Sequence, residues 1–552
     1  MNIKTLNLLI ITLLPLLFFS CNSKKLAYEN RIVIGISSDV QTFNTLFAFS
    51  YEENMITDIL FPGLFDFRWN DEKGELERYP MIAKSWEWSE DSSDISFVIR
   101  NDIYWTDGTK LTSNDVVFSY DVFSDPIVQS RLTGTFNFFY TDKDGKIDIE
   151  KSFTVISPTE FIIHFPEHAA VHINDVSIPV IPENIFSDIK RDQLNSSHIN
   201  YDIVTCGAFK LKKWDKNQSI VLEADSTSFL FNGDQVSELV FKIVPDYTSR
   251  ILQLKKADLD LIELVKVEDM EDLKDYVDLK LFNNVGREYD YIGWNNIDPG
   301  LFNKGKIIPN KFFGSKNVRK ALTYAINRKE IINEYLLNQG EIASTPISPI
   351  FKSAFNDKIK PYSYDPDEAR KLLAMDGWKD EDKNGILEKN GKEFKFKMYY
   401  PVGNPLREYA STVVKNNLKM IGIDVTIEQM ELGAFIDNLY DRKLDSWMAG
   451  WGVPISFELK PFWYSDPNVG VLNFACYGSS EVDSILNLLD AKMSDDRRNE
   501  LIKKFQMVIH KDEPVTFLYW TPNIIAYNKR IKNVNITPNG VLVHCWEWTL
   551  NE

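Results

Sequence analysis

One stretch of the sequence carries oxygen-bearing side chains at the spacing of a calcium-binding loop. Alternate oxygens in such a loop surround the ion, and a carboxylate at the twelfth position closes the site. The residues that match its first half are Asp380, Asp382, Asn384 and Gly385. The twelfth position is Gly391, and Glu388 is the nearest acid that could help. We therefore expect a solvated turn here, and a weak structural calcium site is the alternative.

Three histidines form a second candidate metal site. His164, His168 and His172 repeat every four residues, which would place three imidazoles on one face of a helix. However, Pro166 interrupts any such helix, and Phe161–Phe165 has the composition of a strand. We interpret the three as surface or turn histidines and predict no metal.

The sequence lacks the short motifs of common enzyme active sites. It contains no Gly-x-Ser-x-Gly elbow, no His-Glu-x-x-His, no phosphate-binding glycine-rich loop and no Cys-x-x-Cys. Acidic residues number 80, but no motif singles out a catalytic pair among them. We predict neither an enzyme nor a cofactor.

A cysteine at the N-terminus has a different chemistry, acylation. Leu6–Phe19 is an apolar run with the length of a signal-peptide core, and it is shorter than the ~20 residues that span a membrane. The run ends with Ser20 before Cys21, which resembles the cleavage box of bacterial lipoproteins. That resemblance implies a signal peptide over 1–20, a lipid on Cys21 and a tether over 21–30, holding the protein in the cell envelope, in the periplasm or at the cell surface. Ordinary cleavage near Ser20 is the alternative.

Length and composition limit the fold and the partners. A chain of 552 residues exceeds what one core supports, so we expect two or more lobes. The net charge of −18 argues against nucleic acid as a partner. Beyond Cys21 only Cys206, Cys476 and Cys545 remain, and we expect buried free thiols.

Alternating apolar runs predict the strands. Arg31–Ile36 reads as a buried first strand, and Ser96–Arg100 as a second. Phe153–Phe165 contains a turn signal at Ser157-Pro158-Thr159 and is typical of a hairpin.

Capping signals predict the helices. Thr112 begins one helix with capping-box spacing, and Asp365 followed by Pro366 begins another. Between them, apolar residues over 318–336 recur with a helical period up to Gly340, which predicts a single helix.

Motifs in a fixed order connect these elements with a known family. In Tyr104–Phe118, Asp107-Gly108 supplies a tight turn between a strand and the Thr112-capped helix. Further segments follow along the chain: Ala83–Trp88, Phe97–Arg100, Cys206–Lys210, Val244–Asp246, Asp258–Asp260, Tyr291–Asn295, Asn317–Arg328, Ala369–Trp378, Ile421–Ile423, Ala449–Gly452 and Glu513-Pro514. Their order resembles that of family 5 extracellular solute-binding proteins, the oligopeptide, dipeptide and nickel-binding components of ABC importers.

The resemblance implies an α/β, two-lobed periplasmic-binding-protein-like fold with a hinge of two crossings. The first lobe would comprise 31–287, with an extra subdomain at about 65–200. The second would comprise 288–516, and 517–552 would return to the first. We expect the crossings near Tyr289–Asn295 and Phe517–Trp520. The implied partners are an ABC permease and its ATPase, and a monomer touching the membrane through its lipid alone.

In a two-lobed binding protein the ligand is held between the lobes, so residues near the hinge are the candidates. In the first lobe and at the crossing these are Phe43, Asn44, Ser50, Tyr51, Trp294 and Asn295. In the second lobe they are Arg407, Trp451, Gly452, Glu458, Trp463 and Asn473. A packing role in the core is the alternative for each aromatic residue.

Two charged candidates follow from the peptide-binding members of the family. These hold the ligand's amino group with a carboxylate just after a Gly-Trp-Gly-like segment, because a desolvated ammonium needs a paired charge. The first acid after Gly452 is Glu458. Arg407 is the candidate for a ligand carboxylate, with a solvated or capping role as the alternative.

The resemblance therefore implies a substrate-binding lipoprotein that captures short peptides and delivers them to a permease. The same fold with a metal chelate, haem or an oligosaccharide is the main alternative, because a fold does not fix its ligand. A surface lipoprotein that docks glycans through its aromatic residues is a weaker alternative.

Overall fold

The computed structural model describes residues 30–167, 169, 171, 173–452, 457–538 and 540–551. Cys21 and the signal segment lie outside the described residues. Within the described ranges, none of the helices combines the length and the apolar composition that crossing a membrane requires.

One mixed sheet of 11 strands runs through the molecule, in the order β17-β16-β18-β12-β19-β11-β1-β10-β9-β8, with β13 also paired to β19. Its first-lobe strands are β1 (Arg31–Ile36), β8 (Phe209–Asp215), β9 (Ser219–Ala224), β10 (Glu238–Ile243) and β11 (Leu261–Ile262). Its remaining strands are β12 (Leu279–Trp294), β13 (Glu341–Ile342), β16 (Lys395–Pro401), β17 (Asp424–Met430), β18 (Ser446–Gly452) and β19 (Val515–Asn528). The predicted first strand is confirmed, and it lies parallel to both β10 and β11.

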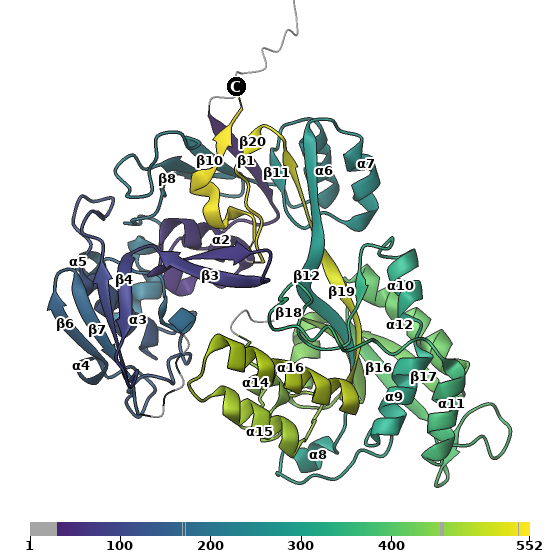
Figure 1. Cartoon of the computed structure of the whole chain (residues 1–552). Helices are drawn as coiled ribbons and strands as arrows, with labels where there is room; N and C mark the ends of the chain where they lie inside the picture. The colour runs from purple at the N-terminus through teal and green to yellow at the C-terminus, as the bar shows by residue number, and fades with distance from the viewer. Residues whose placement is uncertain are drawn as a thin grey trace, which may run out of the picture.

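Strands β12 and β19 connect two lobes. They pair antiparallel, and Figure 1 shows them running from the first-lobe elements at the top to the second-lobe elements at the lower right. Their first-lobe end reaches β11 through β19, and their second-lobe end pairs with β18 through β12. The register of β12 against β19 slips between Val285 and Tyr289. The predicted two-lobed fold with two crossing segments is confirmed.

A separate subdomain completes the first lobe, at the left of Figure 1. It is built around a four-stranded sheet of order β4-β5-β7-β6 and the hairpin β2-β3. These elements are β2 (Phe65–Asn70), β3 (Glu75–Pro80), β4 (Ala83–Trp88), β5 (Asp94–Ile99), β6 (Phe153–Ser157), β7 (Glu160–His164), α3 (Ser113–Ser124), α4 (Ile149–Ser152) and α5 (Glu183–Phe186). The hairpin predicted at Phe153–Phe165 is confirmed, and so is the Thr112 capping box, in which Thr112 N donates to Asp115 Oδ2 at 2.7 Å.

Short elements fill the rest of the first lobe. The helices are α2 (Tyr51–Leu60), α6 (Tyr247–Lys255) and α7 (Met270–Lys274). Short 3-10 helices are η2 (Thr45–Phe47), η3 (Ile173–Val176), η4 (Arg191–Ser196), η5 (His198–Asn200), η6 (Val267–Asp269) and η7 (Leu542–Glu547). The C-terminal strands β20 (Ile531–Lys532) and β21 (Thr549–Leu550) pair with each other.

The second lobe packs helices around its part of the sheet. They are α8 (Pro299–Phe302), α9 (Lys316–Ala325), α10 (Arg328–Glu334), α11 (Pro366–Met375), α12 (Pro405–Lys419), α13 (Leu432–Tyr440), α14 (Lys460–Trp463), α15 (Ser480–Leu489) and α16 (Asp495–Asp512). Strands β14 (Glu388–Lys389) and β15 (Lys392–Glu393) pair antiparallel in a small separate ribbon. The helix predicted to begin with Asp365 and Pro366 is confirmed as α11.

The single helix predicted over 318–336 is wrong. It is divided into α9 and α10, because Ile326 is extended (φ −95°, ψ 119°) and Asn327 begins a new helix. The Asn327 side chain accepts a hydrogen bond from Glu330 N at 3.3 Å, the contact of an N-cap. An apolar period alone does not reveal such a break, since apolar residues of both helices pack into the same core.

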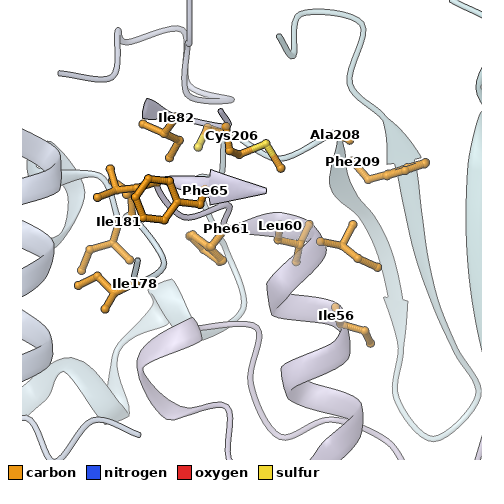
Figure 2. Packing of buried hydrophobic residues seen from close by; sticks show 14 of the residues in the cluster. Ile56, Leu60, Phe61, Phe65, Ile82, Ile178, Ile181, Cys206, Ala208 and Phe209 are labelled. Carbon is orange, nitrogen blue, oxygen red and sulfur yellow. The ribbon is translucent and has the colours of Figure 1, made fainter. Parts of the chain in front are cut away.

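Buried aromatic and aliphatic side chains form the cores. Figure 2 shows part of the first-lobe core, where Ile56 and Leu60 of α2, Phe61, Phe65 and Cys206 gather. Cys206, Cys476 and Cys545 are buried free thiols, as predicted.

Candidate ligand-binding cleft

A cavity of about 390 Å³, which we call the hinge cavity, lies where the lobes meet at the crossing strands. First-lobe residues on its wall include Tyr51, Trp69, Asp71, Glu263 and Leu264. Ile350 and Gly452 contribute from the second lobe, and Val285–Glu288 and Thr521–Asn523 from β12 and β19. A ligand held there would contact both lobes.

A second cavity, the side pocket, has a volume of about 500 Å³ and opens into the first lobe. Much of its wall is apolar, including Met55, Ile59, Phe61, Phe65, Met81, Leu132, Ile178 and Trp546. Figure 2 shows Phe61, Phe65 and Ile178 among the packed residues of the first-lobe core. The side pocket and the hinge cavity share four residues, Tyr51, Glu263, Arg287 and Gly540, so the two cavities meet there.

A third space of about 600 Å³, the outer cavity, separates the β2-β3 hairpin from the second lobe. Its wall includes Trp86, Trp88, Phe351, Phe457 and Arg498. The lobes touch beside it, where Ser353 N donates to the Lys73 carbonyl at 2.9 Å. Trp69 also packs edge-to-face on Phe351, with ring centroids 5.8 Å apart. In this structure the cleft is therefore bridged by direct contacts between the lobes.

The junction of the hinge cavity and the side pocket carries a hydrogen-bonded carboxylate. Tyr51 Oη donates to Glu263 Oε2 at 2.7 Å, and Val541 N donates to Glu263 Oε1 at 3.3 Å. Burial raises the pKa of Glu263, although both hydrogen bonds oppose the shift. Burial likewise lowers the pKa of Arg287. The junction thus offers partly desolvated groups of both signs.

Two predicted residues lie on these walls and one supports them. Tyr51 lines the hinge cavity and the side pocket, and Gly452 lines the hinge cavity. Ser50 caps α2, since its hydroxyl accepts from Glu53 N at 3.2 Å while Glu53 Oε2 accepts from Ser50 N at 2.9 Å. The capping box begins α2 at Tyr51, which fixes that ring at the cleft.

Two further first-lobe candidates belong to the core instead of the cavity wall. Phe43 is fully buried and packs edge-to-face on Trp214 at 5.2 Å. Asn44 is also fully buried, and its amide donates to Asn200 Oδ1 at 2.9 Å. Its oxygen accepts from Leu46 N at 3.0 Å, so the side chain is occupied within the fold.

Three candidates, at the second-lobe end of β12 and in a later loop of that lobe, are also in the core. Trp294 is fully buried, and its indole donates to Thr516 Oγ1 at 3.0 Å. Asn295, at 3% exposure, donates to the Leu444 carbonyl at 2.6 Å. Asn473 donates to the Tyr477 carbonyl at 2.7 Å in the same way. These side chains hold loops of the second lobe together.

Arg407 is paired within the second lobe. Its guanidinium donates to both carboxylate oxygens of Asp290, at 2.7 and 3.1 Å, and its side chain is only 18% exposed. Tyr519 Oη also donates to Asp290, at 3.3 Å. Arg407 and Asp290 thus form an ion pair between α12 and the crossing strand β12.

The remaining second-lobe candidates do not enclose a ligand-sized space. Trp451 and Trp463 line a cavity of about 20 Å³, which holds about one water molecule. Glu458 is exposed beside 453–456, which the structure does not describe. Burial against neighbouring segments nevertheless raises its pKa.

Sequence reasoning missed Trp69, Glu263, Arg287 and Asn523, which line the hinge cavity. For Glu263 a signal existed. It directly follows β11, and β11 is parallel to β1, so both strands end at the same edge of the sheet. Ligands favour the carboxyl ends of parallel strands. Arg287 and Asn523 lie on long strands and became cleft residues only through the crossing.

The candidate metal sites have other contacts. In the calcium-like turn, Asp380 Oδ2 accepts from Gly385 N at 3.1 Å, and Asn384 donates to Asp382 at 3.0 Å. His164 Nδ1 lies 2.8 Å from Asp94 Oδ1, and His168 and His172 lie outside the described residues. Across the described ranges, no group of three or more His, Cys, Asp or Glu side chains could hold a metal ion.

Known proteins are similar to this chain in sequence. The oligopeptide-binding protein AppA of Bacillus subtilis is 26% identical over 528 residues, covering 94% of this chain and 91% of AppA. Heme-binding protein A of Haemophilus influenzae is 25% identical over 484 residues, covering 85% of this chain and 83% of that protein.

Solved structures agree with this likeness. AppA from Bacillus subtilis in complex with a nonapeptide superposes with a TM-score of 0.72 at 25% identity, over 95% of this chain and 99% of AppA. NikZ from Campylobacter jejuni in complex with Ni(L-His) superposes with a TM-score of 0.73 at 23% identity, over 94% and 99% of the two chains. The similarity to NikZ therefore concerns the fold alone.

A sequence model of a protein family gives the assignment. The model of bacterial extracellular solute-binding proteins, family 5 Middle, matches residues 77–468, well over half of the chain. The match begins within β3 and includes β12 and β18, so it covers parts of both lobes. The chain therefore belongs to the bacterial extracellular solute-binding proteins of family 5.

Proposed function

We propose that this chain is the substrate-binding lipoprotein of an ABC importer, which captures short peptides between its lobes and delivers them to a membrane permease. The observation that carries the proposal is the hinge cavity, whose wall is shared by both lobes and both crossing strands. Its relatives AppA of Bacillus subtilis and the dipeptide-binding protein of Escherichia coli support peptides as the cargo.

The walls of the cleft suit a short peptide. Backbone amides require polar partners, and the hinge cavity presents Asn284, Asn523 and Thr521. Side chains of varied size require apolar room, which the side pocket and the aromatic residues of the outer cavity supply. The cavities together exceed the space that one small ion would need.

The hinge of this device lies at the register slip of β12. Gly286 lies within it, and a side chain there would meet the Thr521 carbonyl oxygen of β19, with its Cβ at 2.6 Å. We assign 31–287 to the first lobe with its subdomain at 65–200, 288–516 to the second, and 517–552 to the returning segment. Rotation about two short strand segments is a common way for lobes to close on a ligand.

The anchoring proposal rests on sequence. A lipid on Cys21 would keep the binding protein near its permease and ATPase, where a locally concentrated, ligand-loaded monomer can dock repeatedly. Metabolic labelling with a radioactive fatty acid tests this. Label should enter the wild type and be absent from Cys21→Ser, and label in the serine variant would contradict the assignment.

A non-peptide cargo is the second candidate, because heme-binding protein A is similar to this chain in sequence and NikZ in complex with Ni(L-His) shares its fold. The test is to purify the protein gently, denature it and identify the released molecules by mass spectrometry. Mixed short peptides support the proposal. A single haem, metal chelate or sugar would contradict it and support the alternative.

A further inference from the structure

Glu263 occupies the point where the hinge cavity opens into the side pocket. It follows β11, so the sheet fixes its backbone, and its carboxylate receives Tyr51 Oη at 2.7 Å and Val541 N at 3.3 Å. Both donors are neutral. The carboxylate is thus positioned by two neutral donors, and Arg287 lines the same junction without forming an ion pair with it among the described residues.

Two other carboxylates near this junction have cationic partners. Asp58 pairs with Arg131 at 3.3 Å, and Asp66 pairs with Arg68 at 2.7 Å. Asp66 also contacts His544 Nε2 at 2.7 Å.

Glu263 differs from these acids. Within the described part of the chain, no Lys, Arg or His side chain pairs with it. Asp71 and Glu288 line the hinge cavity as well, but both are exposed to solvent. Glu263 is the half-buried acid whose charge a ligand would compensate most effectively, because a desolvated charge gains most from a partner.

The remaining bonding capacity of Glu263 fits a protonated amine. Two carboxylate oxygens offer about four acceptor positions, of which Tyr51 and Val541 use two. An ammonium group brings three donors and one positive charge, and charge-assisted hydrogen bonds are the stronger kind.

The side pocket begins beside this carboxylate and is lined by Met55, Ile59, Phe65, Leu132 and Trp546. A group bonded to the carbon that carries the amine would enter it. An aliphatic or aromatic group would bury apolar surface there, and a hydrogen atom would leave the pocket unfilled.

Given the proposed function, we propose that Glu263 is the counter-ion of the ligand's protonated amine and that the side pocket holds the apolar group next to that amine. The ligand would then be a peptide with a free amino terminus and a bulky apolar first residue. The first lobe, and not Glu458 of the second, would recognise the amino terminus.

Calorimetric titration of the purified protein tests the charge. The probes are a Leu-first pentapeptide with a free amino terminus and the same peptide acetylated at that amine. Wild type should bind the free peptide about 30-fold more tightly, because acetylation leaves a buried carboxylate unpaired. Glu263→Gln should reduce this ratio to about threefold or less, while Glu458→Gln should retain it.

Tyr51→Phe controls for folding and geometry, since it removes a neutral donor and keeps the carboxylate. It should retain most of the preference for the free amine, which separates the loss of a neutral hydrogen bond from the loss of the charge. Met55→Trp tests the pocket. It should remove the preference for Leu-first over Gly-first peptides and leave the preference for a free amine.

The possible results distinguish failure of the role of Glu263 from failure of the proposed function. Equal binding of free and acetylated peptides by wild type, or loss of the preference in Glu458→Gln and not in Glu263→Gln, would overturn the role of Glu263 while peptide binding stands. Failure to bind any peptide, with haem or a chelate released on denaturation, would overturn the proposed function itself.

Discussion

Arg407 of α12 donates two hydrogen bonds to Asp290 of β12, 2.7 and 3.1 Å long. Gly450 has no side chain that would block them. A Cβ at Gly450 would lie 2.5 Å from both Arg407 Nη2 and Asp290 Oδ1. The pair thus depends on a glycine in the adjacent strand β18. It connects a second-lobe helix to a crossing strand.

Arg407→Ala should destabilise the protein by about 3–5 kcal/mol, because it leaves the carboxylate of Asp290 buried without its partner. The measurement is the free energy of unfolding from urea titration. Arg370→Ala is the matched control, since Arg370 forms an exposed pair with Asp367 and should cost about 1 kcal/mol or less. Loss of ligand binding at unchanged stability would instead show that Arg407 contacts the ligand.

Gly74→Ala should hinder closure of the lobes. Gly74 has φ +63° in the β2-β3 turn, and a Cβ there would lie 2.4 Å from Ile350 O and from Lys352 N in the second lobe. Small-angle X-ray scattering should show a larger radius of gyration, and the affinity for ligand should fall.

Gly108→Ala separates this clash from the cost of a left-handed backbone. Gly108 has φ +86°, but nothing lies within 4 Å of its added Cβ. The variant should lose about 1–2 kcal/mol of stability and close normally. Equal scattering curves for Gly74→Ala and wild type would disprove the interlobe clash.

Trp69 should be the main fluorescent reporter of ligand binding. It lines the hinge cavity and packs on Phe351 across the cleft, so closure changes its surroundings. Trp69→Phe should lose most of the ligand-induced change in emission. Trp378→Phe, which alters a buried second-lobe ring, should retain it. A full response from the Trp69 variant would place the reporter elsewhere.

His510 should make the protein less stable in mild acid. Burial lowers its pKa from 6.5 to about 4, and Lys320 and Arg328 add to the shift while a hydrogen bond with Ser344 opposes it. The folded protein therefore keeps His510 neutral, and the unfolded chain binds a proton there below pH 6.5. This contribution is fully present above pH 6.5 and is lost as pH falls toward 4.

His510→Phe isolates that contribution, because a phenyl ring can keep the stacking on Tyr362, now at 4.4 Å between centroids. Relative to its value at pH 7, the stability of wild type should fall by about 1–3 kcal/mol more than that of the variant at pH 4. Parallel pH profiles of unfolding free energy for the two proteins would contradict it.

Local signals in the sequence were sufficient to predict where helices begin, because a capping residue satisfies backbone groups of its own helix. Asp365 and Pro366 begin α11, and Thr112 begins α3, because caps bond to groups only a few residues away. The break at Asn327 was missed, since an apolar period runs across it unchanged. The two-lobed fold was instead implied by the resemblance of the ordered motifs to a known family.

The sequence by itself determined the family, the α/β class and the two crossings. Tertiary structure decided the site. Trp294 and Asn473 have the composition of ligand contacts but are buried, while Trp69 and Arg287 face the cleft. The reason is that the cavity wall is assembled from segments as distant in sequence as Tyr51, Glu263 and Gly540. A local sequence pattern does not specify which face of a strand will lie against the other lobe.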